Sequence, residues 1–113
     1  MTLRVHDVVS QTGWAVLAGA DHLDHAVRGG YVADLLSCVM AGAEEGDLWI
    51  TLQTHSNIVA VASLLGLAAI VVAEGAPVPE GTLTRAEEQE VVILSSPEPA
   101  YETACRLYTL GVR

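Results

Sequence analysis

The sequence predicts an α/β fold: a small three-layer sandwich in which a mainly parallel sheet is flanked by helices. Three observations favour this class. Residues 48–52 and 68–72 are short apolar segments on either side of an apolar helical segment, which gives a β-α-β order. Both segments are apolar at nearly every position, as in strands that a parallel sheet buries on both faces. A chain of 113 residues suffices for one core, so residues 1–113 are taken as a single domain.

Segments with helical or strand patterns cover most of the chain. Apolar periodicity, turn residues and capping residues set their limits. In chain order they are a helix at residues 6–11, strands at 14–17 and 26–32, a helix at 34–40, a strand at 48–52, a helix at 57–65, a strand at 68–72, a helix at 84–89, a strand at 91–94, and a final helix that starts near residue 99 and that Gly111 ends.

Local signals define three of these helices. Asp34 is expected to cap the helix that follows it. Thr84 and Glu87 have the spacing of a capping box, which predicts that a helix starts there. In the final helix, Glu102 and Arg106 have the i,i+4 spacing of an ion pair. Its inward face is predicted to consist of Tyr101, Ala104, Cys105 and Tyr108.

Composition narrows the range of partners. The formal net charge is −9 and all five basic residues are arginines scattered along the chain, so neither nucleic acid nor a membrane surface is an expected partner. A Walker-type phosphate loop requires a lysine, which this chain lacks, so kinase chemistry through such a loop is excluded. The 51% of hydrophobic residues exceeds what a small domain usually buries, which predicts a homodimer or another protein interface.

Cysteine usage and the N-terminal residues predict a cytoplasmic protein. Cys38 and Cys105 lie in apolar patterns without the spacing of a zinc or redox motif, so both are predicted to be small buried hydrophobic residues. The first residues lack the features of a secretory signal. Residues 58–73 carry no charge, but these sixteen residues are fewer than the roughly 18 to 20 that span a bilayer, and Gly66 divides them.

A run of five polar residues separates the strand at 48–52 from the helix at 57–65. The run consists of Gln53, Thr54, His55, Ser56 and Asn57. Ligands in open α/β sheets bind beyond the carboxyl ends of the strands, and a helix start favours an anion. Two interpretations stay open: the run binds a small anionic ligand, or Ser56 or Asn57 only caps the helix. A histidine can serve as a base or a metal ligand, yet no carboxylate adjacent in sequence orients His55, so no catalytic residue is assigned.

Further candidate ligand residues lie elsewhere in the chain. Gly29 and Gly30 would let the backbone approach a phosphate with Arg28 as counter-charge, and the alternative is a simple bend or bulge. Gly75 is expected on the same strand-end edge as His55, in a loop that otherwise reads as a rigid turn. Residues 21–25 (DHLDH) suggest a divalent metal site completed by His55, or else a solvated loop. No metal ligand and no cofactor is assigned.

Three stretches resemble the DRTGG-domain family and together cover nearly the whole chain. They are RGGYVADLLSCVM, EEGDLWITLQTHSNIVAVASLLGLAAIVVAEGAPVP and VVILSSPEPAYETACRLYTLG. The resemblance implies a fold similar to the N-terminal domain of HPr serine kinase, which lies outside that enzyme's catalytic half. It also implies a regulatory or dimerising role, as DRTGG domains have in phosphotransacetylases and in pyrophosphatases that carry CBS domains.

The chain departs from the motif that names this family. Where many members have Gly-Asp-Arg, this sequence has Thr54, His55 and Ser56, and residues 73–75 (AEG) replace Thr-Gly-Gly. Gly75 and Pro77 match the family pattern. The Gln-Thr-His version at residues 53–55 is similar to a subgroup of stand-alone members whose genes lie near iron-hydrogenase and redox genes.

These observations lead to one functional expectation and two alternatives. We expect a non-enzymatic regulatory or scaffolding module that self-associates as a homodimer and binds a small anionic ligand or a protein partner. The first alternative is a small hydrolase or transferase using His55, which requires a carboxylate or thiol within hydrogen-bond reach of the imidazole. The second is an accessory subunit of a redox or hydrogenase-type assembly, which requires an exposed apolar patch that remains after self-association.

Overall fold

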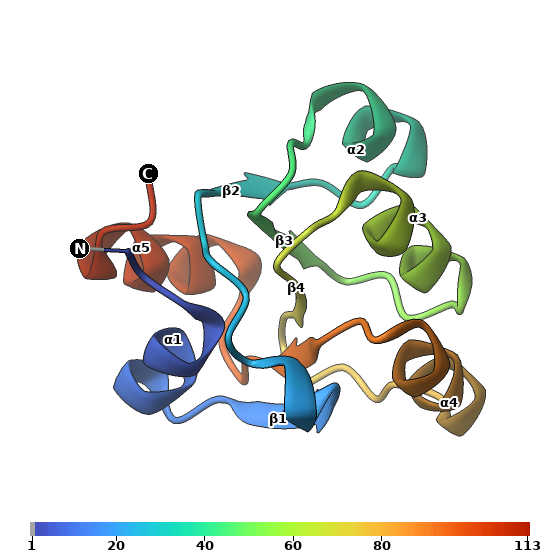
Figure 1. Ribbon diagram of the computed structural model, residues 1–113. Coiled ribbons are helices and arrows are strands. Elements are labelled where there is room, and N and C mark those ends of the chain that lie inside the picture. Colours follow the sequence, from blue (N-terminus) through green and yellow to red (C-terminus); the bar gives the residue numbers. More distant parts are fainter. Residues whose placement is uncertain (1) are drawn as a thin grey trace.

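A computed structural model describes residues 2–113 and has the predicted α/β class (Figure 1). The strands form one five-stranded sheet in the order β1-β5-β4-β3-β2, in which only β1 is antiparallel to its neighbour. In chain order the elements are α1 (Val5–Thr12), β1 (Ala15–Ala18), the 3-10 turn η1 (Ala20–His22), β2 (Gly29–Val32), α2 (Leu36–Gly42), β3 (Asp47–Thr51), α3 (Asn57–Leu65), β4 (Ala69–Val72), α4 (Glu80–Gln89), β5 (Ile93–Ser95) and α5 (Ala100–Leu110).

The sheet is the middle of three layers. Helices α1 and α5 pack on one face, and α2, α3 and α4 pack on the other (Figure 1). In β3, Leu48 and Ile50 join the core with α1 and α5, whereas Trp49 joins the core with α2, α3 and α4. Every residue of β4 is buried. Strands covered on both faces require apolar side chains at successive positions, which explains the two uninterrupted apolar segments.

Helix α3 accounts for the first half of the uncharged stretch at residues 58–73. Its buried side chains include Ile58, Val59 and Ala62, and Gly66 ends it in the left-handed conformation with φ 68°. The predicted helix limits and the turn at Gly66 are therefore confirmed. Within residues 2–113, none of the helices has the length and apolar character that a bilayer crossing requires.

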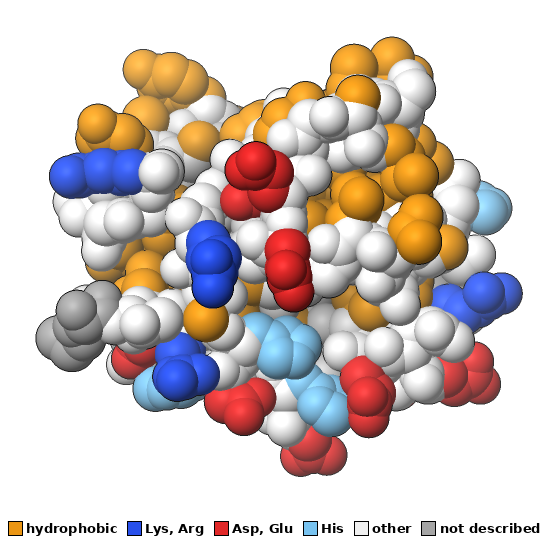
Figure 2. All heavy atoms as spheres, turned by 45° about the horizontal axis from the view of Figure 1, so that its top comes forward, with side chains coloured by type: hydrophobic (Ala, Val, Ile, Leu, Met, Phe, Trp, Pro, Cys, Tyr) orange, Lys and Arg blue, Asp and Glu red, His pale blue; other side chains and the backbone are white. Residues whose placement is uncertain are grey.

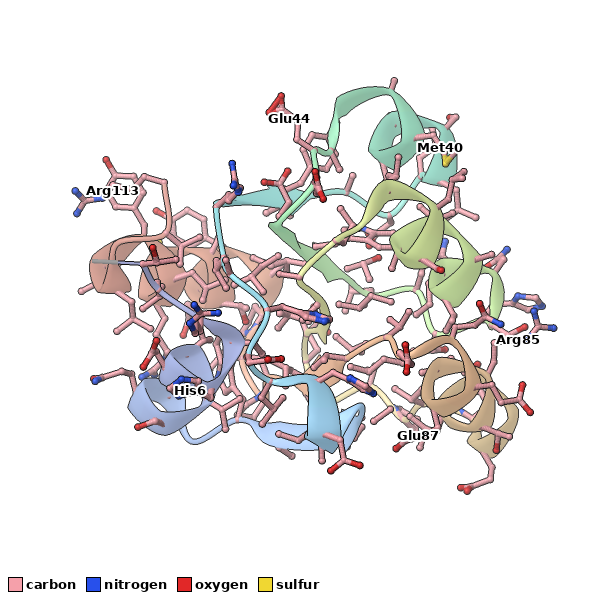
Figure 3. All side chains as sticks on the ribbon, in the orientation of Figure 1. His6, Met40, Glu44, Arg85, Glu87 and Arg113 are labelled. Carbon is pink, nitrogen blue, oxygen red and sulfur yellow. The ribbon has the colours of Figure 1, made fainter. Side chains whose placement is uncertain are left out.

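The predicted start of α4 is wrong. The helix begins at Glu80, directly after Pro79, so Thr84 and Glu87 lie within it and form no capping box. Thr82 is buried, and its hydroxyl donates to the Thr54 carbonyl at 2.8 Å. The Glu87 carboxylate instead accepts the Gly19 N–H at 3.3 Å, and Figure 3 shows Glu87 on the side of α4 that faces β1. Contacts between distant segments have overridden a local capping signal.

Asp34 also has a different role from the predicted one. It does not cap α2, whose N-cap is Leu35. Its Oδ1 atom accepts hydrogen bonds from the Thr51 hydroxyl at 2.9 Å and from the Leu52 amide at 2.8 Å. Asp34 therefore ties the loop after β2 to the end of β3.

The predicted inward face of α5 is wrong for three of its four residues, and only Ala104 packs against the core. Tyr101 and Tyr108 are 79% and 60% exposed, and Cys105 is exposed as well. The side chains that face the sheet are Thr103 and Leu107, at 0% and 2% exposure. A threonine can take an inner position because its hydroxyl bonds to the buried Ser96 hydroxyl at 2.7 Å.

Two further predictions need correction. Cys38 is exposed on α2, so neither cysteine is the buried hydrophobic residue that the apolar pattern predicted. Arg106 pairs with Glu98 in the loop before α5, through a 2.8 Å contact, rather than with Glu102. In both cases the sequence pattern along one helix did not predict what the side chain contacts in the folded protein.

Candidate functional site

The polar run after β3 lies at the carboxyl edge of the sheet. Strands β2 to β5 are parallel, so the loops after them share one edge. There the Ala73 amide donates to the Thr51 carbonyl at 3.0 Å, and the Gly75 amide donates to the Ser96 carbonyl at 2.8 Å. The expectation that Gly75 and His55 belong to the same strand-end edge is therefore confirmed.

His55 takes part in capping α3. Its Nδ1 atom accepts the Asn57 amide at 3.1 Å, and its backbone carbonyl accepts the Ile58 amide at 3.1 Å. Ser56 occupies the N-cap position but makes no capping bond with its side chain. Because Nδ1 acts as an acceptor, a neutral His55 ring carries its proton on Nε2. The contact found at this imidazole is thus a helix amide, whereas the catalytic alternative requires a carboxylate or thiol.

Neighbouring elements hold the loop that carries His55. The Thr51 hydroxyl accepts the Gln53 amide at 3.1 Å, and the Thr82 hydroxyl binds the Thr54 carbonyl. Gln53, His55 and Asn57 are exposed, whereas Thr54 and Ser56 are half-buried. The loop therefore presents three polar side chains to solvent at the amino end of a buried helix.

The turn that contains Gly75 is fixed by its own backbone. Glu74 and Gly75 both adopt the left-handed conformation, at φ 62° and 59°. The Glu74 amide donates to the Glu98 carbonyl at 2.8 Å, and the Gly75 amide is engaged with Ser96. The turn is thus held by hydrogen bonds to residues 96 and 98, which agrees with the interpretation of Gly75 as part of a rigid turn.

An ion pair lies beside this turn. The Arg106 Nε donates to Glu98 Oε1 at 2.8 Å. This hydrogen bond lowers the pKa of the Glu98 carboxyl below its usual value and raises the pKa of Arg106. Glu98 therefore stays ionised at the amino end of α5, where a negative charge is favourable.

Arg28 and Gly29 lie at the opposite, amino edge of the sheet. The Arg28 amide donates to the Gly46 carbonyl at 2.9 Å, just before β2 and β3 begin. A side chain on Gly29 would come within 2.8 Å of an Asp47 carboxylate oxygen, so a larger residue there would displace the Asp47 side chain. The structure therefore does not bring Arg28 and Gly29 together with the run at residues 53–57, and Gly29 and Gly30 form part of β2 rather than a bulge.

A connection across the whole amino edge builds a cavity there. Because β1 and β2 are the two outermost strands, residues 19–28 must cross the starts of β5, β4 and β3 (Figure 1). The cavity has a volume of about 470 Å³. It is lined by His22, His25, Ala26, Arg28, Glu45, Gly46, Ala62, Ser63, Gly66, Leu67, Ala68, Gln89, Glu90 and Val91. We call it the amino-edge cavity.

The amino-edge cavity was not predicted from the sequence. Figure 2 shows histidine side chains between acidic and basic ones in the lower middle of the view. The sequence suggested a metal site that joins the DHLDH stretch to His55, which lies at the other edge, and it suggested Arg28 as the counter-charge to a phosphate at Gly29 and Gly30. Among residues 2–113, no group of three or more His, Cys, Asp and Glu side chains is arranged to hold a metal ion.

A second cavity, of about 280 Å³, lies between α5 and the outermost strand β2. It is lined by Gly30, Val32, Ile50, Ala104, Leu107, Tyr108, Val112 and Arg113. Val32 is 53% exposed at its rim, and the Arg113 guanidinium lies 4.5 Å from the centre of the Tyr108 ring. We call this apolar cavity and its rim the β2–α5 groove. Gly30, which the sequence suggested as a ligand residue together with Arg28 and Gly29, lines this groove.

Comparison with known proteins agrees with this fold. The DRTGG domain model matches residues 7–110. A solved structure of the CBS and DRTGG domains of the regulatory region of Clostridium perfringens pyrophosphatase, complexed with the activator diadenosine tetraphosphate, is similar with a TM-score of 0.70 and 16% identity. The similar region covers 91% of this chain and 44% of that one, so this chain spans less than half of its relative. No curated protein matches the sequence. Since the family model covers most of the sequence, the chain belongs to the DRTGG domain family.

Proposed function

We propose that this protein is a non-enzymatic regulatory module that self-associates through the β2–α5 groove. The observation that carries the proposal is an apolar cavity whose rim exposes Val32, on an outermost strand, and Tyr108, on α5. Removing apolar surface from water is favourable by about 25 cal/mol per Å², and this gain opposes the entropy cost of association. The occurrence of a DRTGG domain in the regulatory region of a pyrophosphatase supports the regulatory part.

Charge favours a second copy of the chain as the occupant of the groove. Each chain carries a formal net charge of −9, so most faces of two copies repel each other. Of the residues that line the groove, only Arg113 is charged, and its guanidinium already stacks on Tyr108. Two copies that meet at this face bury apolar surface without bringing carboxylates together, and a two-fold axis lets the same patch serve both.

The regulatory signal in this proposal is a small anionic ligand at the carboxyl edge. Gln53, His55 and Asn57 are exposed at the amino end of α3, where a helix dipole favours an anion. Asp34 bonds to Thr51 and Leu52 from the loop that follows β2. Val32 at the end of β2 forms part of the groove rim. The two hydrogen bonds of Asp34 therefore connect the loop that would bind the ligand to the strand that would form the interface.

Sedimentation velocity at micromolar concentration tests self-association. We expect a dimer for the natural sequence, and at least about tenfold weaker association for Val32→Lys, because the interface would then bury an unpaired charge. The matched control is Leu64→Lys, which puts the same charge at a 71% exposed apolar position of α3, on the other face of the sheet. A monomeric natural protein, or equal effects of both substitutions, would contradict the proposal.

A thermal-shift titration with inorganic phosphate and ATP tests the ligand. The melting temperature should rise for the natural protein, and the rise should disappear in the double variant Gln53→Ala, Asn57→Ala. The control is Ser10→Ala, Gln11→Ala, which removes two exposed polar side chains from α1. A rise that survives in the first double variant would place the anion elsewhere, and no rise at all would remove the ligand from the proposal.

A further inference from the structure

We infer that the amino-edge cavity binds a small organic cation, of the class of primary amines and diamines. This site is separate from the β2–α5 groove and from the polar run at the carboxyl edge. The inference does not depend on the proposed function. It rests on the shape of the cavity, on the charges that line it and on the hydrogen-bond state of one of its two imidazoles.

The cavity has the size and the lining of a small-molecule site. Its volume of about 470 Å³ falls within the range of about 300 to 1,000 Å³ found for ligand pockets. Leu67, Ala68 and Val91, at the starts of β4 and β5, give it an apolar wall. Polar groups from four other segments complete it, so a ligand would meet an apolar surface on one side and hydrogen-bonding groups on the others.

The fixed charges around the cavity favour a cation. Two carboxylates, Glu45 and Glu90, line it, against the single guanidinium of Arg28. Helices α3 and α4 both end at the cavity, and a helix carboxyl end carries a partial negative charge of about half an electron. Glu90 follows α4 directly and adopts φ 59°, a fixed left-handed conformation at the cavity wall. An anion would meet two carboxylates and two unfavourable helix ends.

One of the two imidazoles can offer an acceptor to a ligand. His25 Nδ1 lies 3.3 Å from the Ala68 carbonyl oxygen, which can only accept, so Nδ1 must donate. In a neutral ring this leaves Nε2 of His25 as an acceptor for an ammonium N–H. His22 Nε2 lies 3.9 Å from a Glu90 carboxylate oxygen, and the two imidazole centres are 6.2 Å apart. An amine in the cavity would therefore find carboxylate and imidazole acceptors within one small volume.

Arg28 provides a way to test whether the bound ligand is a cation or an anion. A side chain on Gly46 would meet Arg28 Cγ and Cδ at 2.9 Å, which shows that the stem of Arg28 lies directly over that glycine. Its guanidinium repels a bound cation but would attract an anion. Removal of this charge should therefore strengthen the binding of a cation and weaken the binding of an anion.

Nuclear magnetic resonance of the imidazole C–H groups tests the inference directly, with putrescine as the probe and inorganic phosphate as the probe of opposite charge. The chain has four histidines, two in the cavity and two outside it. Putrescine should shift the signals of His22 and His25 along one saturable curve and leave those of His6 and His55 in place. Unmoved His22 and His25 signals would overturn the inference, as would equal shifts of all four signals.

Charge variants separate a specific site from general attraction by an acidic protein. We expect Glu90→Gln and Glu45→Gln each to weaken putrescine binding about tenfold, as for the loss of a charge-assisted hydrogen bond. Glu88→Gln makes the same charge change on an exposed residue of α4 outside the cavity lining, and should leave binding unchanged. Arg28→Gln should strengthen it. Equal effects of Glu88→Gln and Glu90→Gln, or phosphate binding that Arg28→Gln abolishes, would overturn the inference.

Discussion

The two edges of the sheet use their polar residues in opposite ways. At the carboxyl edge, Asp34, Thr82 and Thr103 bond to protein groups and hold short loops in place. At the amino edge, histidine, arginine and glutamate side chains surround a cavity. The difference arises because the four loops that follow β2, β3, β4 and β5 at the carboxyl edge each connect a strand to the next helix, whereas one long connection crosses the amino edge. Conventional reasoning about parallel sheets points to the first edge, yet the larger of the two cavities described lies at the second.

The largest expected effect concerns the start of the crossing connection. Gly19 has φ 78°, and a side chain there would come within 2.8 Å of the Val91 carbonyl and of Val92 Cα. We expect Gly19→Ala to lower the free energy of unfolding by about 3 to 5 kcal/mol, from left-handed strain and overpacking together. Chemical denaturation measures this, with Gly13→Ala as the control.

Gly13 makes a matched control because it shares the conformation but not the surroundings. Its φ is 75°, and a side chain there would meet nothing within 4 Å. We expect Gly13→Ala to cost only about 1 kcal/mol. Equal losses for the two variants would show that close contact with Val91 and Val92, just before β5, does not hold the crossing connection in place.

The second effect tests the polar network of the carboxyl edge. Ser96 and Thr103 are fully buried, and the Thr103 hydroxyl also donates to the Glu98 carbonyl at 3.1 Å. We expect Thr103→Val to lower the unfolding free energy by about 1 to 3 kcal/mol, because the buried Ser96 O–H loses its acceptor and the Ser96 hydroxyl keeps only the Glu98 amide as a partner. The control is Thr109→Val on the exposed side of α5, which should change stability by no more than about 0.5 kcal/mol.

A smaller effect is expected at the polar run. The His55 ring accepts one amide at the start of α3. His55→Ala should cost about 0.5 to 1 kcal/mol, the usual loss for a helix cap. The control His6→Ala removes an exposed imidazole in the first turn of α1. Equal thermal stability of His55→Ala and the natural protein would show that water replaces the capping bond.

The smallest effect depends on pH. Arg106 lowers the pKa of Glu98 in the folded protein, so the unfolded chain binds more protons as the pH falls below the usual carboxyl value. The stabilisation by this pair is therefore complete above the usual carboxyl pKa and is lost as the pH falls through the lowered one. Arg106→Gln should differ slightly from the natural protein at neutral pH and not at all in strong acid. Denaturation midpoints between about pH 2 and pH 7 measure the difference, and a constant difference would assign the effect to packing.

Several expectations stay predictions. They are the extent of the domain, the cytoplasmic location, the homodimer, the similarity to the N-terminal domain of HPr serine kinase and the link to redox assemblies. The proposed ligand and the amino-edge site extend beyond what shared fold implies, since the pyrophosphatase relative is only 16% identical and is more than twice as long as the region it shares with this chain.

The sequence by itself determined the frame of this protein. Strands β3 and β4 and helix α3 were predicted within one residue at each limit. Elements buried on both faces are apolar at nearly every position, and this pattern can be recognised without knowledge of distant contacts. The position of residues 53–57 at the carboxyl edge follows from the same local β-α order.

Tertiary structure decided the rest. The inward face of α5, the start of α4 and the role of Asp34 depend on hydroxyls and amides from distant segments, which local spacing does not reveal. The amino-edge cavity depends on strand order, since only the placement of β1 and β2 at opposite sides of the sheet makes residues 19–28 cross three strand starts. The local sequence pattern determines whether a segment is a helix or a strand, whereas long-range packing determines which side chains it contacts. A binding site depends on the second, because its residues come from segments far apart in the sequence.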